Sequence, residues 1–258
     1  MQLLQTEIFG KIAKPESFDE LMNFICSNTY EESYFLTRMW RGQSDVSWPI
    51  HSGAYRRINP SSDRELVSYE KRLLNNATHR GYRFVDGREL TDLELLARLQ
   101  HHGAATRLLD TSRNALIALW FCCASSPNKT GLLAGIHTDH LGGYEGEVET
   151  KPYEDVMTKI MKFNHPFTWE PTSVTNRIAA QSSQFLFSKI STDKWGSISL
   201  PKKEGATLFI AISPTLKEQS LTVLQQVFDI HHLTLFPDID GFSLSHSHDR
   251  DEFSNNRW

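Results

Sequence analysis

Residues 40–49 combine the side-chain types that bind a phosphorylated, aromatic ligand. Their sequence, WRGQSDVSWP, places an arginine, a glycine and two tryptophans within nine positions. An arginine fork matches phosphate oxygens, a glycine lets backbone approach a ligand closely, and an indole stacks on a flat ring. We therefore interpret Arg41 with Gly42 as the anchor of a nucleotide pocket, with Gln43 or Trp48 holding the base or amide. The alternative is a surface strand end whose tryptophans belong to the core.

A second candidate segment is the polar connection 103–114 between two expected helices, which contains Arg107 and Asp110. His101 and His102 precede it at the end of the first helix. Carboxylates and imidazoles act as general bases, so Asp110 is the first candidate for a catalytic base and His102 the second. Arg107 either binds phosphate or orients Asp110 through an ion pair. The alternatives are a structural Arg107–Asp110 pair that caps the following helix, and structural or hydrogen-bonding histidines.

Local sequence patterns predict the elements that position these residues. The aromatic, β-friendly segment 34–41 predicts a strand that delivers Arg41 at its end. Thr91 and Glu94 form a capping box, which predicts a helix that stops at Gly103 and carries the two histidines at its C-terminal end. The apolar run 115–124 predicts a buried helix.

The remaining chain favours an α+β architecture. We expect helices at 18–25, capped by Ser17, at 65–77 and after Ser213, and strands at 131–137, 184–190 and 206–212. Loops are expected at 139–175, a hairpin or loop at 192–205, and a frayed tail at 245–258. The helix after Ser213 is expected to bury Leu221, Leu224 and Phe228. No internal repeat or long linker interrupts the 258 residues, so we predict one domain, 1–258, with helices segregated from the strands.

Composition limits the function classes. The net charge is -4, from 27 Lys+Arg against 31 Asp+Glu, so the whole molecule has no general attraction for nucleic acid or anionic membrane. Three cysteines, two of them adjacent in an apolar run, do not form a disulfide framework and favour a reducing compartment. No segment is long and apolar enough to span a membrane. We therefore expect a cytoplasmic protein without membrane contact.

Residues 56–88 have the opposite charge to the whole chain. They contain eight Lys+Arg and four Asp+Glu, a local balance of +4. This stretch is either a solvated helix face or a docking surface for a polyanion or an acidic partner.

Metal and hydrolase chemistry have weaker support. Histidines occur in pairs at 101–102 and 231–232, and a further group is His246, His248 and Asp249, but none has a zinc-protease or zinc-finger spacing. We therefore expect no metal site. The sequence also lacks a Gly-x-Ser-x-Gly elbow and a Walker phosphate loop.

Six ordered motifs resemble the FRG domain family, named for a Phe-Arg-Gly motif that here carries tryptophan in place of phenylalanine. They are WRGQ at 40–43, HHG at 101–103, TRLLD at 106–110, NALIAL at 114–119, NRI at 176–178 with Gln181 and Phe185 following, and LFPDIDG at 235–241. The resemblance covers roughly residues 34–242.

This resemblance implies a fold and an activity. FRG domains look like members of the ADP-ribosyltransferase-like group, which implies two small sheets with flanking helices around a central cleft that binds NAD as substrate. Several bacterial proteins of this kind act as toxins in toxin–antitoxin or phage-defence systems. The resemblance thus implies ADP-ribosylation of a macromolecule, most of all mRNA, with an antitoxin and a SecB-like chaperone as expected partners.

The resemblance also exposes a departure at residue 184. Splitting the nicotinamide–ribose bond develops positive charge on the ribose, as in glycoside cleavage. The ADP-ribosyltransferase-like group usually has a glutamate at the position of residue 184, whereas the similar stretch of this sequence has Gln184. An amide can hydrogen-bond the ribose hydroxyls but cannot act as a general base. Either another group is then the base, or the acceptor is already nucleophilic, or the protein is a non-catalytic nucleotide- or RNA-binding module.

Overall fold

The computed structural model describes residues 1–27, 30–31, 34–35, 38–143, 146, 149–172 and 175–247. Most of the expected tail, including His248 and Asp249, lies outside these ranges, as do residues 36–37 of the strand expected at 34–41. Within the described ranges, the helices lack the length and hydrophobicity that crossing a bilayer requires.

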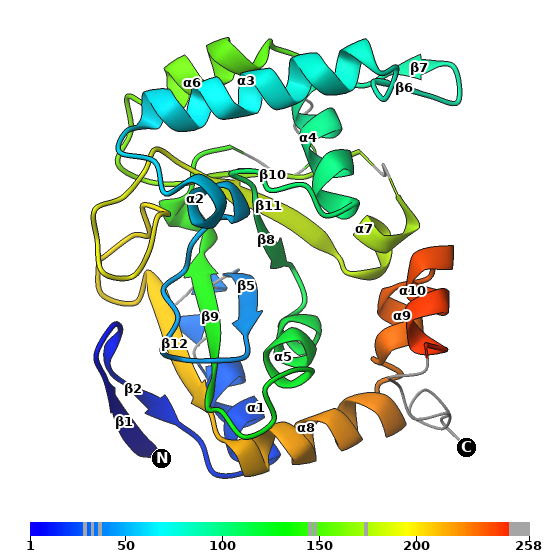
Figure 1. Ribbon diagram of the computed structural model, residues 1–258. Helices are drawn as coiled ribbons and strands as arrows, with labels where there is room; N and C mark the ends of the chain where they lie inside the picture. Colours follow the sequence, from blue (N-terminus) through cyan, green and yellow to red (C-terminus); the bar gives the residue numbers. More distant parts are fainter. Residues whose placement is uncertain are drawn as a thin grey trace.

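The chain alternates irregularly between strands and helices (Figure 1). The strands are β1 Gln2–Thr6, β2 Gly10–Lys14, β3 Tyr30–Glu31, β4 Tyr34–Phe35, β5 Arg38–Gln43, β6 Phe84–Val85, β7 Arg88–Glu89, β8 Leu109–Ser112, β9 Gly131–His137, β10 Phe167–Trp169, β11 Ser183–Phe187 and β12 Thr207–Ile212. The helices are α1 Phe18–Ser27, α2 Gly53–Ile58, α3 Asp63–His79, α4 Asp92–His101, α5 Ala115–Cys123, the 3₁₀ helix η1 Thr138–His140, α6 Tyr153–Ile160, α7 Asn176–Ala180, α8 Pro214–Gln226, α9 His232–Leu235 and α10 Ile239–Ser245.

Eight strands form one mixed sheet in the order β1-β2-β12-β9-β5-β8-β11-β10. β2 and β12 pair in parallel, and the other neighbours are antiparallel. β5 pairs with β9 over six residues but with β8 only at Trp40 and Ser112. The structure therefore has one large sheet where two separate small sheets were expected. The single β5–β8 pair nevertheless joins a five-stranded part to the three-stranded part β8-β11-β10.

Separate helices cover the two parts of the sheet. The apolar helix α5 packs on β5, with Trp40 in a core that it shares with α1 and α8. α3, α4 and α6 supply a second core with the aromatic residues of β10 and β11. In Figure 1, α3 and α6 lie beyond the β10 and β11 edge, whereas α1 and α8 lie at the opposite end. The α+β class predicted from the sequence is confirmed.

Most expected elements are present. Ser17 accepts a hydrogen bond from the Glu20 amide at 3.1 Å, and the capping box at the start of α4 is formed as predicted. Two predictions were wrong. Residues 139–175 are not only loops, because they contain η1, α6 and β10. α8 ends before Phe228, which is 44% exposed, so only this member of the predicted stripe was wrong. Leu224 is buried and Leu221 partly buried as expected, and Leu216 joins them.

Candidate functional site

A cavity of about 780 Å³ opens where β5 and β8 diverge. Both strands contribute to its wall, together with the end of α4, α5, α7 and β11. The residues that line it are Trp40, Arg41, Gly42, Gln43, Ser44, Trp48, Pro49, His51, Arg56, Ala97, Gln100, His101, Asp110, Thr111, Ser112, Ala118, Phe121, Arg177, Ile178, Gln181, Ser183, Phe185 and Phe236. Its size lies within the range of about 300–1,000 Å³ that is usual for small-molecule and cofactor sites.

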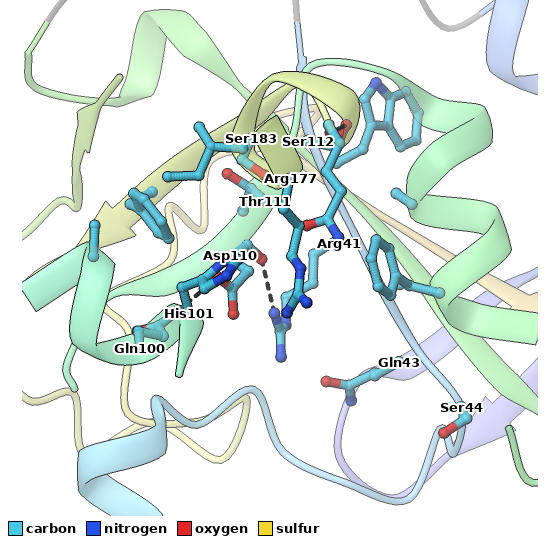
Figure 2. A pocket seen from close by; sticks show the side chains of 18 of the residues that line it. Arg41, Gln43, Ser44, Gln100, His101, Asp110, Thr111, Ser112, Arg177 and Ser183 are labelled. Carbon is cyan, nitrogen blue, oxygen red and sulfur yellow. Dashed lines mark hydrogen bonds between the residues drawn. The ribbon is translucent and has the colours of Figure 1, made fainter. Parts of the chain in front are cut away.

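Arg41 is fixed in the cavity by the neighbouring strand. Its Nη1 donates a 2.7 Å hydrogen bond to the backbone oxygen of Asp110, which is drawn in Figure 2. Its Nε is buried and has no hydrogen-bond partner among the described residues. Burial lowers the pKa of the guanidinium, and the negative charge of Asp110 acts against that shift. An anionic ligand would compensate the lost hydration of this cation.

Asp110 presents its carboxylate to the same cavity. Its Oδ1 accepts a 2.6 Å hydrogen bond from Nε2 of Gln100. The side chain is exposed to the cavity, yet the surrounding protein displaces enough water for burial to raise the pKa of the carboxyl group above its ordinary value. The charge of Arg41 and the bond from Gln100 oppose this rise. A carboxylate with a raised pKa is a stronger base, as a general base requires.

Two further arginines make the cavity cationic. Arg56 lies in its wall, and Arg177 is held by a bidentate pair with Asp238, at 2.9 and 2.7 Å. Figure 2 shows Arg41, Arg177 and Asp110 directed toward one another. The lining has three arginines and one carboxylate, and Asp238 compensates the charge of Arg177. The positive charge that remains attracts an anion, for which a pyrophosphate is a suitable size.

The histidines of the cavity carry little positive charge near neutral pH. Burial and the charge of Arg56 lower the pKa of His51. Burial, followed by the charge of Arg177 and the neighbouring His102, lowers the pKa of His101, while Asp238 acts in the opposite direction. Both imidazoles are thus available as hydrogen-bonding groups, and the arginines supply the cavity's permanent positive charge.

Gly42 lines the cavity, and its missing side chain is also needed for packing. A Cβ at this position would lie 1.9 Å from the backbone oxygen of Ala118 and 2.6 Å from the amide nitrogen of Cys122, both in α5. Close approach of its backbone to a ligand stays a prediction. Gln43 donates a 2.6 Å hydrogen bond to the Trp48 oxygen and so shapes the loop, while the indole of Trp48 stays 49% exposed at the cavity.

Arg107 lies outside the cavity and binds no ligand there. It is 2% exposed, and its Nε donates a 2.6 Å hydrogen bond to Glu70, which is fully buried. Tyr153 also donates to Glu70, and the resulting network joins α3, α6 and the chain before β8. The sequence-based choices of a phosphate ligand or a partner of Asp110 were wrong, because Arg107 pairs with a carboxylate of α3.

Gln184 and His102 also lie away from the cavity lining. Strand alternation places Ser183 and Phe185 at the cavity and Gln184 on the other face, where its Nε2 donates to Thr168 at 2.6 Å. Gln184 therefore does not reach a ligand in this cavity. His102 ends α4 with a 59% exposed side chain beside Asp240, so the histidine that lines the cavity is its neighbour His101.

Some residues of the site lie in sequence features noted above but were not predicted to belong to the site. Arg177 stands in the NRI motif and Arg56 in the basic stretch, but neither was given a role in the site. Gln100 precedes the histidine pair by one position and carried no separate signal. All three lie in the cavity because α2, α4 and α7 converge on β5 and β8, which spacing along the chain does not reveal.

Lys217 fixes the chain that leaves β5 for the cavity rim. Its ammonium group is buried and donates to the backbone oxygens of Ser44, Ser125 and Ser126, at 2.8, 3.2 and 3.1 Å. We expect Lys217→Met to lower the free energy of unfolding by about 2 kcal/mol, since buried carbonyls lose their donor. Urea denaturation would measure the change. Lys203→Met at an exposed position is the control, and equal stability of both variants would contradict the role of Lys217.

These features define an α+β protein with a ligand-sized, arginine-lined cavity. Among known families, the model of the FRG domain matches residues 37–130. The resemblance predicted from the sequence is thus confirmed over the stretch that contains Arg41, the histidine pair, Asp110 and α5. The motifs at 176–178 and 235–241 lie beyond the matched stretch. Comparison with curated proteins and with solved structures gave no match.

Proposed function

We propose that the protein is an NAD-dependent ADP-ribosyltransferase that modifies a macromolecule. The observation that carries this proposal is the pairing of Arg41, a desolvated cation with an unpartnered Nε, with Asp110, a carboxylate of raised pKa, in one cavity. Arg41, Arg56 and Arg177 suit a pyrophosphate. Trp48 and Phe121 offer flat apolar surface to the rings of a dinucleotide.

In the proposed reaction, the bond between nicotinamide nitrogen and the ribose anomeric carbon breaks, and neutral nicotinamide leaves. An acceptor oxygen or nitrogen forms the new bond to that carbon and loses its proton. Asp110 is the proposed base for this proton, in place of the glutamate that the resemblance implies. The arginines keep the pyrophosphate fixed, so that binding energy from this remote part of NAD positions the reacting carbon.

RNA, and mRNA in particular, is the proposed acceptor. Within the basic stretch, Arg57, Arg64, Arg72 and Arg80 are exposed. Glu70, one of the acidic residues counted against them, is buried and paired with Arg107. Lys71, Arg83 and Arg88 of the stretch pair with Glu154, Asp92 and Glu94. The four exposed arginines are therefore the part of this stretch that would contact a polyanion.

The proposal extends to a biological role through the FRG resemblance. We propose a toxin that arrests bacterial growth or defends against phage, from the cytoplasm, with an antitoxin and a SecB-like chaperone as partners. What supports this step is the family resemblance, and the cavity itself supports only the chemistry.

A second candidate function is a nucleotide- or RNA-binding module without turnover. The position of Gln184 favours it, because the residue in place of the usual glutamate faces Thr168 and away from the cavity. In that case the arginines would bind a nucleotide, and Asp110 would only be a hydrogen-bond acceptor.

The proposed function is tested by incubating the protein with radiolabelled NAD and separate pools of RNA, DNA and cell protein. We expect label in RNA, and we expect Arg41→Ala to lower transfer about 100-fold or more, because it removes the phosphate anchor. Lys11→Ala, at an exposed position of β2 outside both the cavity and the basic stretch, should transfer normally. Equal transfer by Arg41→Ala and wild type would contradict the site. Binding of NAD without release of nicotinamide would instead support the binding module.

A further inference from the structure

A cluster of metal-ligating side chains lies at the rim of the cavity. His101, His102 and Asp240 each bring one ligand atom into a group whose members are all within 4.8 Å of one another. The two histidines end α4, whereas Asp240 lies in the first turn of α10. Figure 2 shows the His101 side chain directed toward Asp110. The cluster therefore joins the cavity to the C-terminal helices.

We propose that His101, His102 and Asp240 bind one divalent transition-metal ion of the Zn²⁺ class. Two imidazoles and one carboxylate form a ligand set that such ions accept, and three protein ligands leave coordination positions open. This site goes beyond the proposed transferase function and does not depend on it. It also departs from the sequence-based expectation of no metal site.

The geometry requires only a small movement of exposed side chains. Ligand atoms around a tetrahedral Zn²⁺ are about 3.4 Å apart, given bonds of about 2.1 Å. His102 Nδ1 and Asp240 Oδ2 are 4.0 Å apart, and these side chains are 59% and 67% exposed. Both are thus free to close on an ion without repacking the core. His101 is 8% exposed and supplies the fixed member of the set.

The surroundings of the cluster also favour a cation. Asp238 places Oδ2 3.5 Å from Nε2 of His101, and Arg177 holds that carboxylate in a bidentate pair. A carboxylate that orients a ligating imidazole is a common feature of metal sites. The C-terminal end of α4 adds the negative end of a helix dipole. Asp238 thus offsets the positive charge of Arg177 beside the cluster, and Asp240 supplies the negative charge of the ligand set.

An ion in this position would border the ligand cavity. His101 belongs both to the cavity lining and to the cluster. The open coordination positions would therefore be available to an anionic oxygen of a bound ligand or to water. The site would also tie α10 to α4. Two pairs connect these helices here, His101 with Asp238 and His102 with Asp240.

A binding experiment without NAD tests this site. The tag-free full chain would be titrated with Co²⁺, whose visible absorption reports nitrogen and oxygen ligands, and Zn²⁺ would be added in competition. We expect one ion per chain, displaced by Zn²⁺, and a rise in melting temperature with Zn²⁺. His102→Ala and Asp240→Asn should each weaken binding at least about tenfold.

His79→Ala is the matched control, because His79 is an exposed histidine of α3 outside the cluster. It should bind as wild type does. Failure of the wild type to bind either ion would overturn the site. Unchanged affinity in both His102→Ala and Asp240→Asn would also overturn it, because the ion would then be held elsewhere. Neither result would touch the transferase proposal, since the assay contains no nucleotide.

Discussion

Gly42→Ala is expected to lower the free energy of unfolding by about 3 kcal/mol or more. The new Cβ would lie 1.9 Å from the Ala118 oxygen and 2.6 Å from the Cys122 nitrogen, and both are backbone atoms of α5 that no side-chain rotation can move. Overpacking usually costs about 1–3 kcal/mol, and a clash with helix backbone belongs at the upper end. Strand β5 and α5 must separate, which also displaces Arg41. Thermal and urea denaturation would measure the loss.

Gly53→Ala provides the matched control for this prediction. A Cβ at Gly53, the first residue of α2, would meet its nearest neighbour, the Cα of Ala105, at 3.5 Å, an ordinary contact. We expect the control to be neutral or slightly stabilising, because alanine has less backbone freedom in the unfolded chain. A Gly42→Ala variant as stable as Gly53→Ala would show that β5 and α5 are not packed as described.

Local patterns along the chain predicted much of this fold. Thr91 and Glu94 form their capping box with atoms only three residues apart, so the sequence contains the whole interaction. β9 is buried along its full length, and α5 is mostly buried, as their continuous apolar sequences indicate. The strand that carries Arg41 was predicted from its aromatic and β-friendly residues, but β5 continues past Arg41 to Gln43, so Arg41 does not stand at its end. Elements of this kind are determined mainly by their own residues.

Assigning partners to the charged residues required the tertiary structure. Arg107 and Asp110 are three positions apart, yet Arg107 pairs with Glu70, 37 residues away. Spacing could not show that α3 brings a carboxylate into the core at that point. The position of Gln184 could not be predicted for a related reason. Whether Gln184 or its neighbours face the cavity depends on strand register. Register comes from the pairing of β11 with β8 and β10, which no short motif contains.

The cavity also depends on a feature that sequence could not reveal. β5 and β8 pair only at Trp40 and Ser112. Beyond this pair the strands separate, which leaves room between the residues that follow Trp40 and the residues that precede Ser112. Arg41 follows this pair along β5, whereas Asp110 precedes it along the antiparallel β8. Their nearness, with a 2.7 Å bond from Arg41 to the Asp110 backbone, results from the same pairing. Arg41 and Asp110 form a site because β5 and β8 separate beside them.

Asp110→Asn is expected to reduce transfer from NAD by about 100- to 10,000-fold and to leave NAD binding within a few-fold of wild type. The amide keeps the shape of the side chain and can still accept from Gln100, but it cannot take a proton. Rates of nicotinamide release and equilibrium binding of NAD would separate the two effects. Wild-type transfer should fall as the pH drops through the Asp110 pKa, which burial places above 3.8. Transfer by Asp110→Asn at the normal rate would exclude Asp110 as the base.

Asp110→Asn is expected to raise the stability of the fold although it lowers activity. Because the pKa of Asp110 is higher in the folded than in the unfolded state, the ionised carboxylate destabilises the fold at pH values above both. This penalty diminishes as the pH falls through the folded pKa and disappears below the unfolded one. We therefore expect Asp110→Asn to melt at a higher temperature than wild type at pH 7 and to lose this advantage in acid. A variant that is less stable at pH 7 would mark Asp110 as a structural residue. A variant that is more stable and inactive is the result expected of a residue retained for chemistry at a cost in stability.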